Sequence, residues 1–254
     1  MQPVQGCKKE DAVPQELKST VSLDAQFPAA LATEICPDLA IAPLDPVAIY
    51  RFLGYPQAVT PAPRMSEHIA RIVAETQSCL HPRGAYAMYA VSSSTAYSLQ
   101  LDDTTISGKI GEYLKQADRI ADFVVTVGEE ISHLSESAAK DGDAFSAWVM
   151  DAVGSWAVES AADALMLRLR RHLDEDRELT LRYSPGYCGM DMGQQRKLFR
   201  LVPASSVGVT LMPSMLMHPL KSISGLVGFA PREAVSQYRS PCDFCPRTGC
   251  HMRR

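Results

Sequence analysis

The sequence predicts an α+β fold: a mixed, largely antiparallel and twisted sheet with flanking helices, one long helix and a cysteine-rich C-terminal tail. Helical and strand-like segments alternate along the 254 residues, without the regular rhythm of a doubly wound sheet. Residues 120–127 form an almost unbroken apolar run, which is typical of a central strand buried on both faces. Residues 144–172 keep a helical spacing of apolar side chains throughout, which predicts the long helix.

The first part of the chain predicts an extension followed by two helices. Residues 1–44 mix Pro, charged and apolar residues without a clean period, so we expect a loosely structured N-terminal extension with a short ordered piece near residues 31–41. Asp45 and Pro46 predict a helix start, with Asp as N-cap and Pro at the first helical position. Apolar residues at helical spacing then predict a second helix over residues 66–80.

The middle of the chain predicts strands first and helices afterwards. Two apolar stretches with a Ser-rich turn between them indicate a pair of strands, and Ser107 begins a predicted helix that ends at Ala117. After the central strand, a short helix is expected over residues 129–139. Asp143 is the expected N-cap of the long helix, whose basic end suits a helix C-terminus.

The next stretch places an arginine at the end of a strand. Residues 179–183 alternate as a half-buried strand does, and residues 184–187 carry the Pro and Gly of a tight turn. Arg182 therefore lies just before this turn, where a fixed guanidinium can bind a carboxylate through two hydrogen bonds. A pairing with Asp191, or simple exposure to solvent, is the alternative.

Three cysteines near the C-terminus predict a metal site. Cys242, Cys245 and Cys250 have spacings that let thiolates turn round one metal ion or cluster. Three thiolates suit an iron–sulfur cluster with an open or borrowed fourth ligand, whereas the addition of His251 would suit zinc. A tail with fortuitous cysteines is the remaining alternative.

Composition excludes several classes of protein. A net charge of −4 and a pI near 5.9 argue against a dedicated nucleic-acid binder. No apolar run reaches the ~20 residues of a membrane-spanning helix, and residues 1–17 lack a hydrophobic signal core, so we expect a cytoplasmic protein. The seven cysteines are an odd number, which is typical of reduced thiols.

Several motifs occur in an order that resembles one known family. Arg182-x-x-x-Gly186-Tyr187, the strand 208–211, Met217-His-Pro219 and Ser222-Ile-Ser-Gly225 resemble the activation domain of vitamin B12-dependent methionine synthase, and most closely its stand-alone members. The resemblance covers roughly residues 45–235. It suggests three parts: the extension 1–44, an activation-like domain over 45–238 and a Cys-rich tail over 239–254.

The resemblance implies a ligand, a cofactor and partners. The family's domain binds S-adenosylmethionine and presents its methyl group to reduced cobalamin. By resemblance, Arg182 would hold the ligand's carboxylate, and Gly186, Tyr187 and Cys188 would frame it. The chain has no Asp-x-His-x-x-Gly, no G-x-G-x-x-G and no phosphate loop. The cobalamin is therefore expected on a partner methionine synthase or other corrinoid protein.

Three functions remain open at this point. The first is a reactivation module that binds S-adenosylmethionine and supports reductive methylation of the partner's cobalamin, with flavodoxin or ferredoxin as a further candidate partner that donates electrons. The second is an iron–sulfur redox protein that itself donates electrons for corrinoid activation. The third is a non-catalytic partner protein stabilised by zinc. Whether the chain is an enzyme in its own right is left open.

Overall fold

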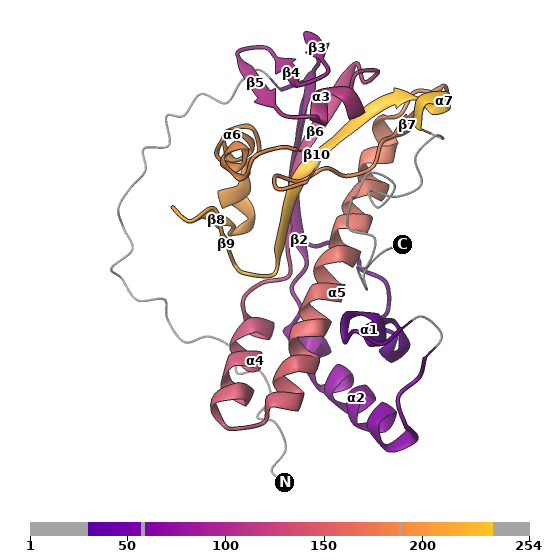
Figure 1. Ribbon diagram of the computed structural model, residues 1–254, viewed down its shortest axis with the longest axis vertical. Coiled ribbons are helices and arrows are strands. Elements are labelled where there is room, and N and C mark those ends of the chain that lie inside the picture. The colour runs from indigo at the N-terminus through magenta and orange to yellow at the C-terminus, as the bar shows by residue number, and fades with distance from the viewer. Residues whose placement is uncertain (1–29, 57–58, 188, 236–254) are drawn as a thin grey trace.

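A five-stranded antiparallel sheet forms the centre of the molecule, with strand order β1-β2-β6-β10-β7 (Figure 1). The computed structural model describes residues 30–56, 59–187 and 189–235. The sheet strands are β1 (Ala32–Cys36), β2 (Arg83–Ala90), β6 (Arg119–Thr126), β10 (Ser222–Pro231) and β7 (Arg177–Leu179). The predicted α+β class, its antiparallel sheet and the central position of the apolar run are confirmed.

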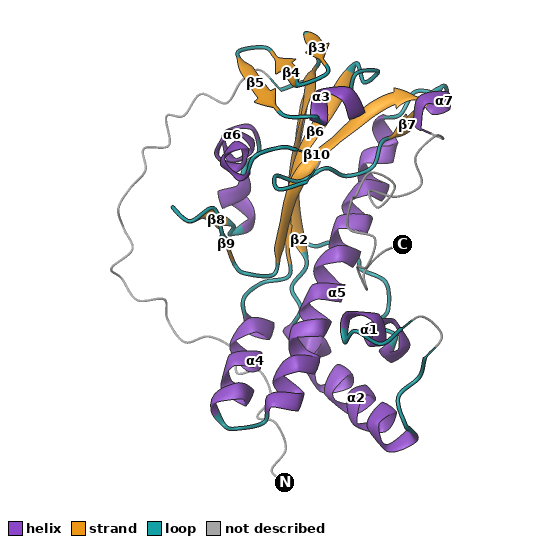
Figure 2. Ribbon diagram, in the orientation of Figure 1, coloured by secondary structure: helices purple, strands orange, loops and turns teal. Residues whose placement is uncertain are grey.

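The long helix α5 (Ala144–Leu169) runs along one face of the sheet (Figure 2). Asp143 caps it as predicted, because its carboxylate accepts a hydrogen bond from the Ser146 amide at 3.0 Å. Around its N-terminal half lie α1 (Pro46–Phe52), α2 (Pro63–Thr76) and α4 (Glu130–Lys140). Both tryptophans of the chain, Trp148 and Trp156, belong to α5.

The opposite face of the sheet is covered by α6 (Gln195–Leu201) and by the segment that follows it. Next come the small hairpin of β8 (Thr210–Leu211) and β9 (Met217–His218). One end of the sheet carries the three-stranded sheet of β3 (Ser93–Thr95), β4 (Ser98–Leu101) and β5 (Thr104–Ser107), with α3 (Ile110–Tyr113) and α7 (Arg232–Val235) nearby (Figure 1). None of the described helices has both the length and the apolar character needed to cross a bilayer.

The expectations for two segments can be compared with the structure. The ordered piece expected near residues 31–41 is present, and it is a strand of the main sheet, since β1 pairs with β2 over five residues and Leu39 is buried. The helix expected over 107–117 is reduced to α3: Ser107 pairs with β4 instead, and the helix ends at Tyr113. Gly111 lies so close to the β3–β4 backbone that an added Cβ would be 2.2 Å from the Thr95 carbonyl oxygen.

A carboxylate on β1 joins this edge strand to the end of α5. Glu34 accepts hydrogen bonds from Tyr86 Oη at 2.6 Å and from Arg168 Nη1 at 3.0 Å, and Arg171 Nη2 lies 3.0 Å from its other oxygen. The hydrogen bond from Tyr86 is the main cause that lowers the pKa of Glu34, and Arg168 adds to it against the effect of burial. This ionic cluster fixes β1 to the sheet although its strand is short.

We expect Glu34→Gln to weaken the fold mainly at neutral pH. A pKa lowered by folding stabilises the native state above the ordinary pKa of Glu, about 4.3, and this contribution is lost as the pH falls through the folded pKa. The substitution should cost about 1–2 kcal/mol at pH 7 and flatten the acid limb of stability. Urea unfolding over a pH series measures both effects, and an unchanged acid limb would contradict the assignment.

Candidate functional site

The segment that carries the predicted arginine lies along the outer side of β10. The Thr180 amide donates to the Gly228 carbonyl at 2.9 Å, and Tyr183 and Leu226 exchange two backbone hydrogen bonds. The strand predicted over residues 179–183 is therefore partly regular: β7 ends at Leu179, and pairing resumes at Tyr183. Arg182 is held between these two anchor points.

The Arg182 side chain reaches α5. Its Nη2 lies 2.9 Å from Glu159 Oε2 and 3.2 Å from Asp163 Oδ1. These two carboxylates are one helical turn apart, so they share one face of α5. The alternative pairing of Arg182 with Asp191 is not found; Asp191 instead caps the turn at Met192–Gln194 by accepting from the Gly193 amide at 2.7 Å.

The second terminal nitrogen of Arg182 is a buried donor without an acceptor. Nη1 is buried and has no hydrogen-bond partner among the described residues. The Arg182 side chain as a whole is 20% exposed. A buried N–H without a partner costs about 1–3 kcal/mol. One cation beside two carboxylates also leaves this group of side chains with a net negative charge. The geometry suits a ligand that offers a carboxylate to Nη1 and a cationic group to the acidic pair.

The two sequence motifs meet in space beside this arginine. Ser184 Oγ donates to the Ser224 carbonyl at 2.7 Å, so the turn after Arg182 is bonded to the central part of β10. Gly225 makes this approach possible, because an added Cβ would lie 2.6 Å from the Tyr183 carbonyl oxygen. Ser224 Oγ in turn accepts from Gln195 Nε2 at 2.9 Å, which connects the turn to α6.

Gly186 and Tyr187 form an exposed loop that follows Arg182 in the chain. Gly186 has a φ of +92°, a conformation that favours glycine, and its amide donates to the Met190 carbonyl. The Tyr187 side chain is 63% exposed. The loop therefore presents an exposed aromatic ring, and Cys188, also predicted to frame the ligand, lies outside the described residues.

The predicted metal ligands Cys242, Cys245 and Cys250 lie outside the described residues as well. Within the described ranges, no three His, Cys, Asp or Glu side chains gather closely enough to hold a metal ion. Cys36 is a free, buried thiol, whereas Cys79 is disulfide-bonded, which differs from the expectation of reduced thiols.

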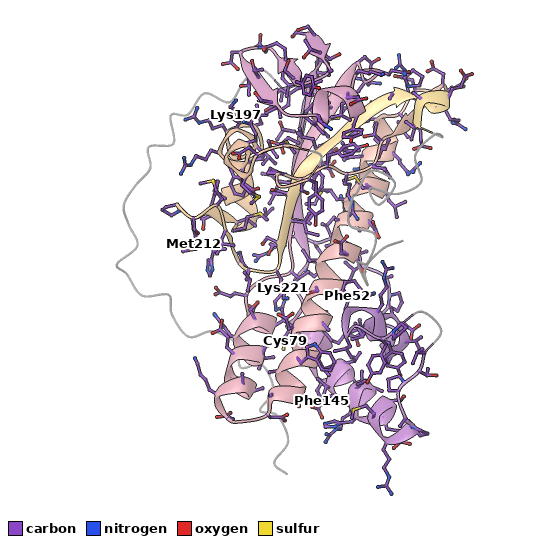
Figure 3. The ribbon with its side chains drawn as sticks, in the orientation of Figure 1. Phe52, Cys79, Phe145, Lys197, Met212 and Lys221 are labelled. Carbon is purple, nitrogen blue, oxygen red and sulfur yellow. The ribbon has the colours of Figure 1, made fainter. Side chains whose placement is uncertain are left out.

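Polar residues at the opposite end of the sheet form ion pairs with one another. Glu129 lies 3.2 Å from His218 Nε2, and Glu130 lies 3.8 Å from His81 Nε2. Lys221, close to His218 in the chain, binds Asp151 at 2.7 Å and Ser155 at 2.9 Å, and so fastens the start of β10 to α5 (Figure 3). These contacts stabilise the end of the sheet away from Arg182.

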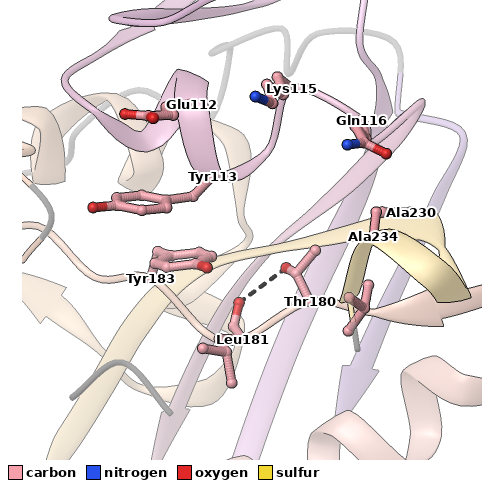
Figure 4. A pocket seen from close by; sticks show the side chains of 10 residues that line it. Glu112, Tyr113, Lys115, Gln116, Thr180, Leu181, Tyr183, Ala230 and Ala234 are labelled. Carbon is pink, nitrogen blue, oxygen red and sulfur yellow. Dashed lines mark hydrogen bonds between the residues drawn. The ribbon is translucent and has the colours of Figure 1, made fainter. Parts of the chain in front are cut away.

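A small hollow opens on the other side of the Arg182 segment (Figure 4). The rings of Tyr113 and Tyr183 stack there with centroids 5.4 Å apart, and Thr180 and Leu181 line it too. Leu181 and Tyr183 face the hollow, while Arg182 between them points to α5. The hollow is therefore separate from the arginine and its carboxylates.

Comparison with known proteins assigns the chain to a family. The model of the family described as "Vitamin B12 dependent methionine synthase, activation domain" matches residues 110–238, slightly more than half of the chain. The chain therefore belongs to this family. A solved structure described as "Crystal Structure of the MetH Reactivation Domain bound to AdoHcy" has a similar fold, with a TM-score of 0.55 and 15% sequence identity. The likeness covers 87% of this chain and 86% of that one. No curated protein sequence matches.

The acidic partners of Arg182 are the residues that sequence reasoning missed. Neither Glu159 nor Asp163 belongs to one of the motifs that the sequence singles out. Their spacing of four residues was the available signal, since it places both carboxylates on one face of the long helix. Which element this face meets depends on the pairing of β7 with β10, which no local pattern reveals.

Proposed function

We propose that this chain is a reactivation module that binds S-adenosylmethionine and supports reductive methylation of cobalamin held on a partner protein. Membership of the activation-domain family supports the connection with cobalamin and methionine synthase. The structural neighbour was solved with AdoHcy bound, which supports a ligand of the same kind here. A cobalamin-carrying methionine synthase or corrinoid protein is the proposed partner, and the cytoplasm is the proposed location.

One observation carries the ligand assignment: the buried, unpaired Nη1 of Arg182 beside Glu159 and Asp163. The amino-acid end of S-adenosylmethionine is a zwitterion. Its carboxylate can accept from Nη1, and its ammonium can approach the two carboxylates in place of part of their interaction with Nη2. We propose that Gly186, Tyr187 and Cys188 frame the rest of the ligand at the exposed loop.

The proposed reaction requires mainly that the protein position S-adenosylmethionine relative to the partner's cobalamin. Reduced cobalamin on the partner would supply the electron pair that displaces sulfur from the methyl carbon. The electrons of the broken carbon–sulfur bond stay on sulfur, and a neutral thioether remains. The residues of this chain hold the ligand and orient its methyl group, and no protein nucleophile is needed.

We expect Arg182→Ala to remove most of the affinity for S-adenosylmethionine. Loss of a charge-assisted hydrogen bond of about 1.5–3 kcal/mol corresponds to roughly a 10-fold to 150-fold weaker Kd. Calorimetric titration of the full chain measures this. Arg64→Ala, which removes an exposed arginine from α2, is the matched control and should bind normally.

A wild-type chain that does not bind S-adenosylmethionine would refute the proposed function. Equal binding by Arg182→Ala, with the fold verified by circular dichroism, would move the ligand away from this arginine. The metal-dependent alternatives, an iron–sulfur redox protein and a zinc-stabilised partner, stay predictions. A visible absorption spectrum and metal analysis of anaerobically purified protein test them, because an iron–sulfur cluster is coloured and zinc is not.

A further inference from the structure

Both ends of the loop that carries Gly186 and Tyr187 are bonded to one residue, Ser224. At the first end, Ser184 Oγ donates to the Ser224 carbonyl oxygen at 2.7 Å. At the other end, Gln195 Nε2 donates to Ser224 Oγ at 2.9 Å. Gln195 is 3% exposed and Ser224 is 2% exposed, so this second bond is shielded from water. The backbone and the side chain of a single β10 residue therefore fix where the loop begins and where it ends.

Gln195 is itself part of an element that is fixed to the sheet. It is the first residue of α6, whose Leu198 and Leu201 side chains are buried. Tyr89 Oη, from β2, donates to the Leu201 carbonyl oxygen at 2.6 Å, so the other end of the helix is bonded to the sheet as well. Gln195 thus connects the loop to a helix that cannot shift without disturbing the packed core.

We infer that Gln195 is a positioning residue of the ligand site, because its bond to Ser224 preorganises the loop that frames the ligand. This inference rests on the proposed function, which places Gly186 and Tyr187 against S-adenosylmethionine. A loop that is fixed at one end only samples more backbone conformations, and a ligand that requires one of them must overcome the entropy of ordering the loop. The bond made by Gln195 orders the loop during folding, before the ligand arrives.

Hydrogen bonds inside the loop can report how well it is ordered. The Gly186 amide donates to the Met190 carbonyl oxygen at 2.8 Å, and the Met190 amide donates to the Tyr187 carbonyl oxygen at 2.9 Å. Such amides exchange slowly with deuterium in a closed structure and faster when the structure opens locally. Their exchange rates therefore measure the order of the loop in the ligand-free protein.

The experiment compares the full-length wild type with Gln195→Leu, Ser224→Ala, the double variant and Ser135→Ala. Each of the first two substitutions removes one partner of the same bond and leaves the other buried and unpaired, whereas the double variant removes both partners. Ser135→Ala is the matched control, because Ser135 Oγ makes a hydrogen bond of similar length, 2.8 Å to the Ala147 carbonyl oxygen, between α4 and α5. Calorimetry gives the affinity for S-adenosylmethionine, urea unfolding gives the stability, and deuterium exchange gives the order of the loop.

Both single variants should bind S-adenosylmethionine roughly 2-fold to 12-fold more weakly, which corresponds to one net hydrogen bond. Their loop amides should exchange faster than those of the wild type. The double variant should regain part of the lost stability, because no buried polar group is left unpaired, yet it should bind as weakly as the single variants. Affinity and stability then change independently, which a merely structural role of Gln195 would not produce. Ser135→Ala should lose stability alone.

An affinity that recovers together with the stability in the double variant would overturn the inference. Wild-type affinity or wild-type loop exchange in both single variants would overturn it as well, and in each of these cases the proposed function stands. If the wild type does not bind S-adenosylmethionine, the proposed function fails and this inference fails with it.

Discussion

Replacing Gly225 with alanine should damage both the fold and the ligand site. The new Cβ would lie 2.6 Å from the Tyr183 carbonyl oxygen and 3.0 Å from Ser184 Oγ. The nearest contact is with backbone that pairs with β10, so it cannot be relieved by a rotamer change. We expect a loss of stability near the upper end of overpacking costs, about 3 kcal/mol.

The same substitution should weaken binding by more than misfolding explains. The turn that follows Arg182 is held to Ser224 by a single side-chain hydrogen bond, and a shift of Tyr183 moves the arginine away from Glu159. Urea unfolding gives the stability, and calorimetry of the folded fraction gives the affinity.

Gly142→Ala is the control for Gly225→Ala. Position 142 has a φ of +85°, but an added Cβ there meets no atom within 4 Å. This variant should cost about 1 kcal/mol through backbone strain and leave ligand binding intact. Normal affinity and near-native stability in Gly225→Ala would show that the Arg182 segment does not depend on this close approach.

Asp122→Val should make the protein more stable at neutral pH. Asp122 lies in the central strand β6 on the face away from α5, and both carboxyl oxygens are buried without a hydrogen-bond partner among the described residues. Desolvation by burial raises the pKa of this carboxyl well above its usual range. Burial also raises the pKa of the nearby Tyr89 to about 12, and Asp122 adds to this shift.

The sign of the pH dependence follows from the raised pKa. Because the unfolded chain ionises Asp122 more readily than the folded one, the native state is favoured most below the ordinary pKa of about 3.9 and loses stability as the pH rises toward the folded pKa. Removal of an unpaired buried polar group should restore up to about 3 kcal/mol at pH 7. Asp122→Val should also abolish the loss of stability with rising pH.

Urea unfolding of wild type and Asp122→Val between about pH 4 and about pH 9 measures this. Asp38→Asn, which changes an exposed carboxylate, serves as the control and should keep the decline. If Asp122→Val is less stable than the wild type and its stability depends on pH in the same way, the Asp122 carboxyl must form hydrogen bonds in solution.

Local signals predicted the parts of the fold that local chemistry determines. Asp45 and Asp143 were recognised as N-caps because an aspartate before a helical apolar pattern supplies the missing acceptor, and both carboxylates do so in the structure. The apolar run of β6 likewise predicted burial on both faces. The family resemblance was carried by motifs that the fold brings together, and the family is confirmed.

Elements that depend on contacts between distant residues could not be predicted from the sequence. The strand β1 is five residues long and alternates weakly, so only its pairing with β2, some fifty residues later, makes it a strand. The helix expected over 107–117 is likewise shorter than predicted, since Ser107 pairs with β4 and α3 ends at Tyr113. Asp122 passed unnoticed within an apolar run, because hydrophobic pattern alone does not show that the sheet buries it without a partner.

The position of the two tryptophans gives the molecule an optical reporter that needs no label. Because both lie on α5, tryptophan emission comes from this helix alone. Trp156 is 9% exposed and lies one helical turn before Glu159, whereas Trp148 is 46% exposed. A dissolved quencher such as iodide quenches the exposed Trp148 more strongly than the buried Trp156. The remaining fluorescence therefore comes mainly from Trp156, one helical turn from a carboxylate that pairs with Arg182. A ligand that binds there should change the emission wavelength or the intensity of the Trp156 fluorescence, so ligand binding can be followed by fluorescence titration.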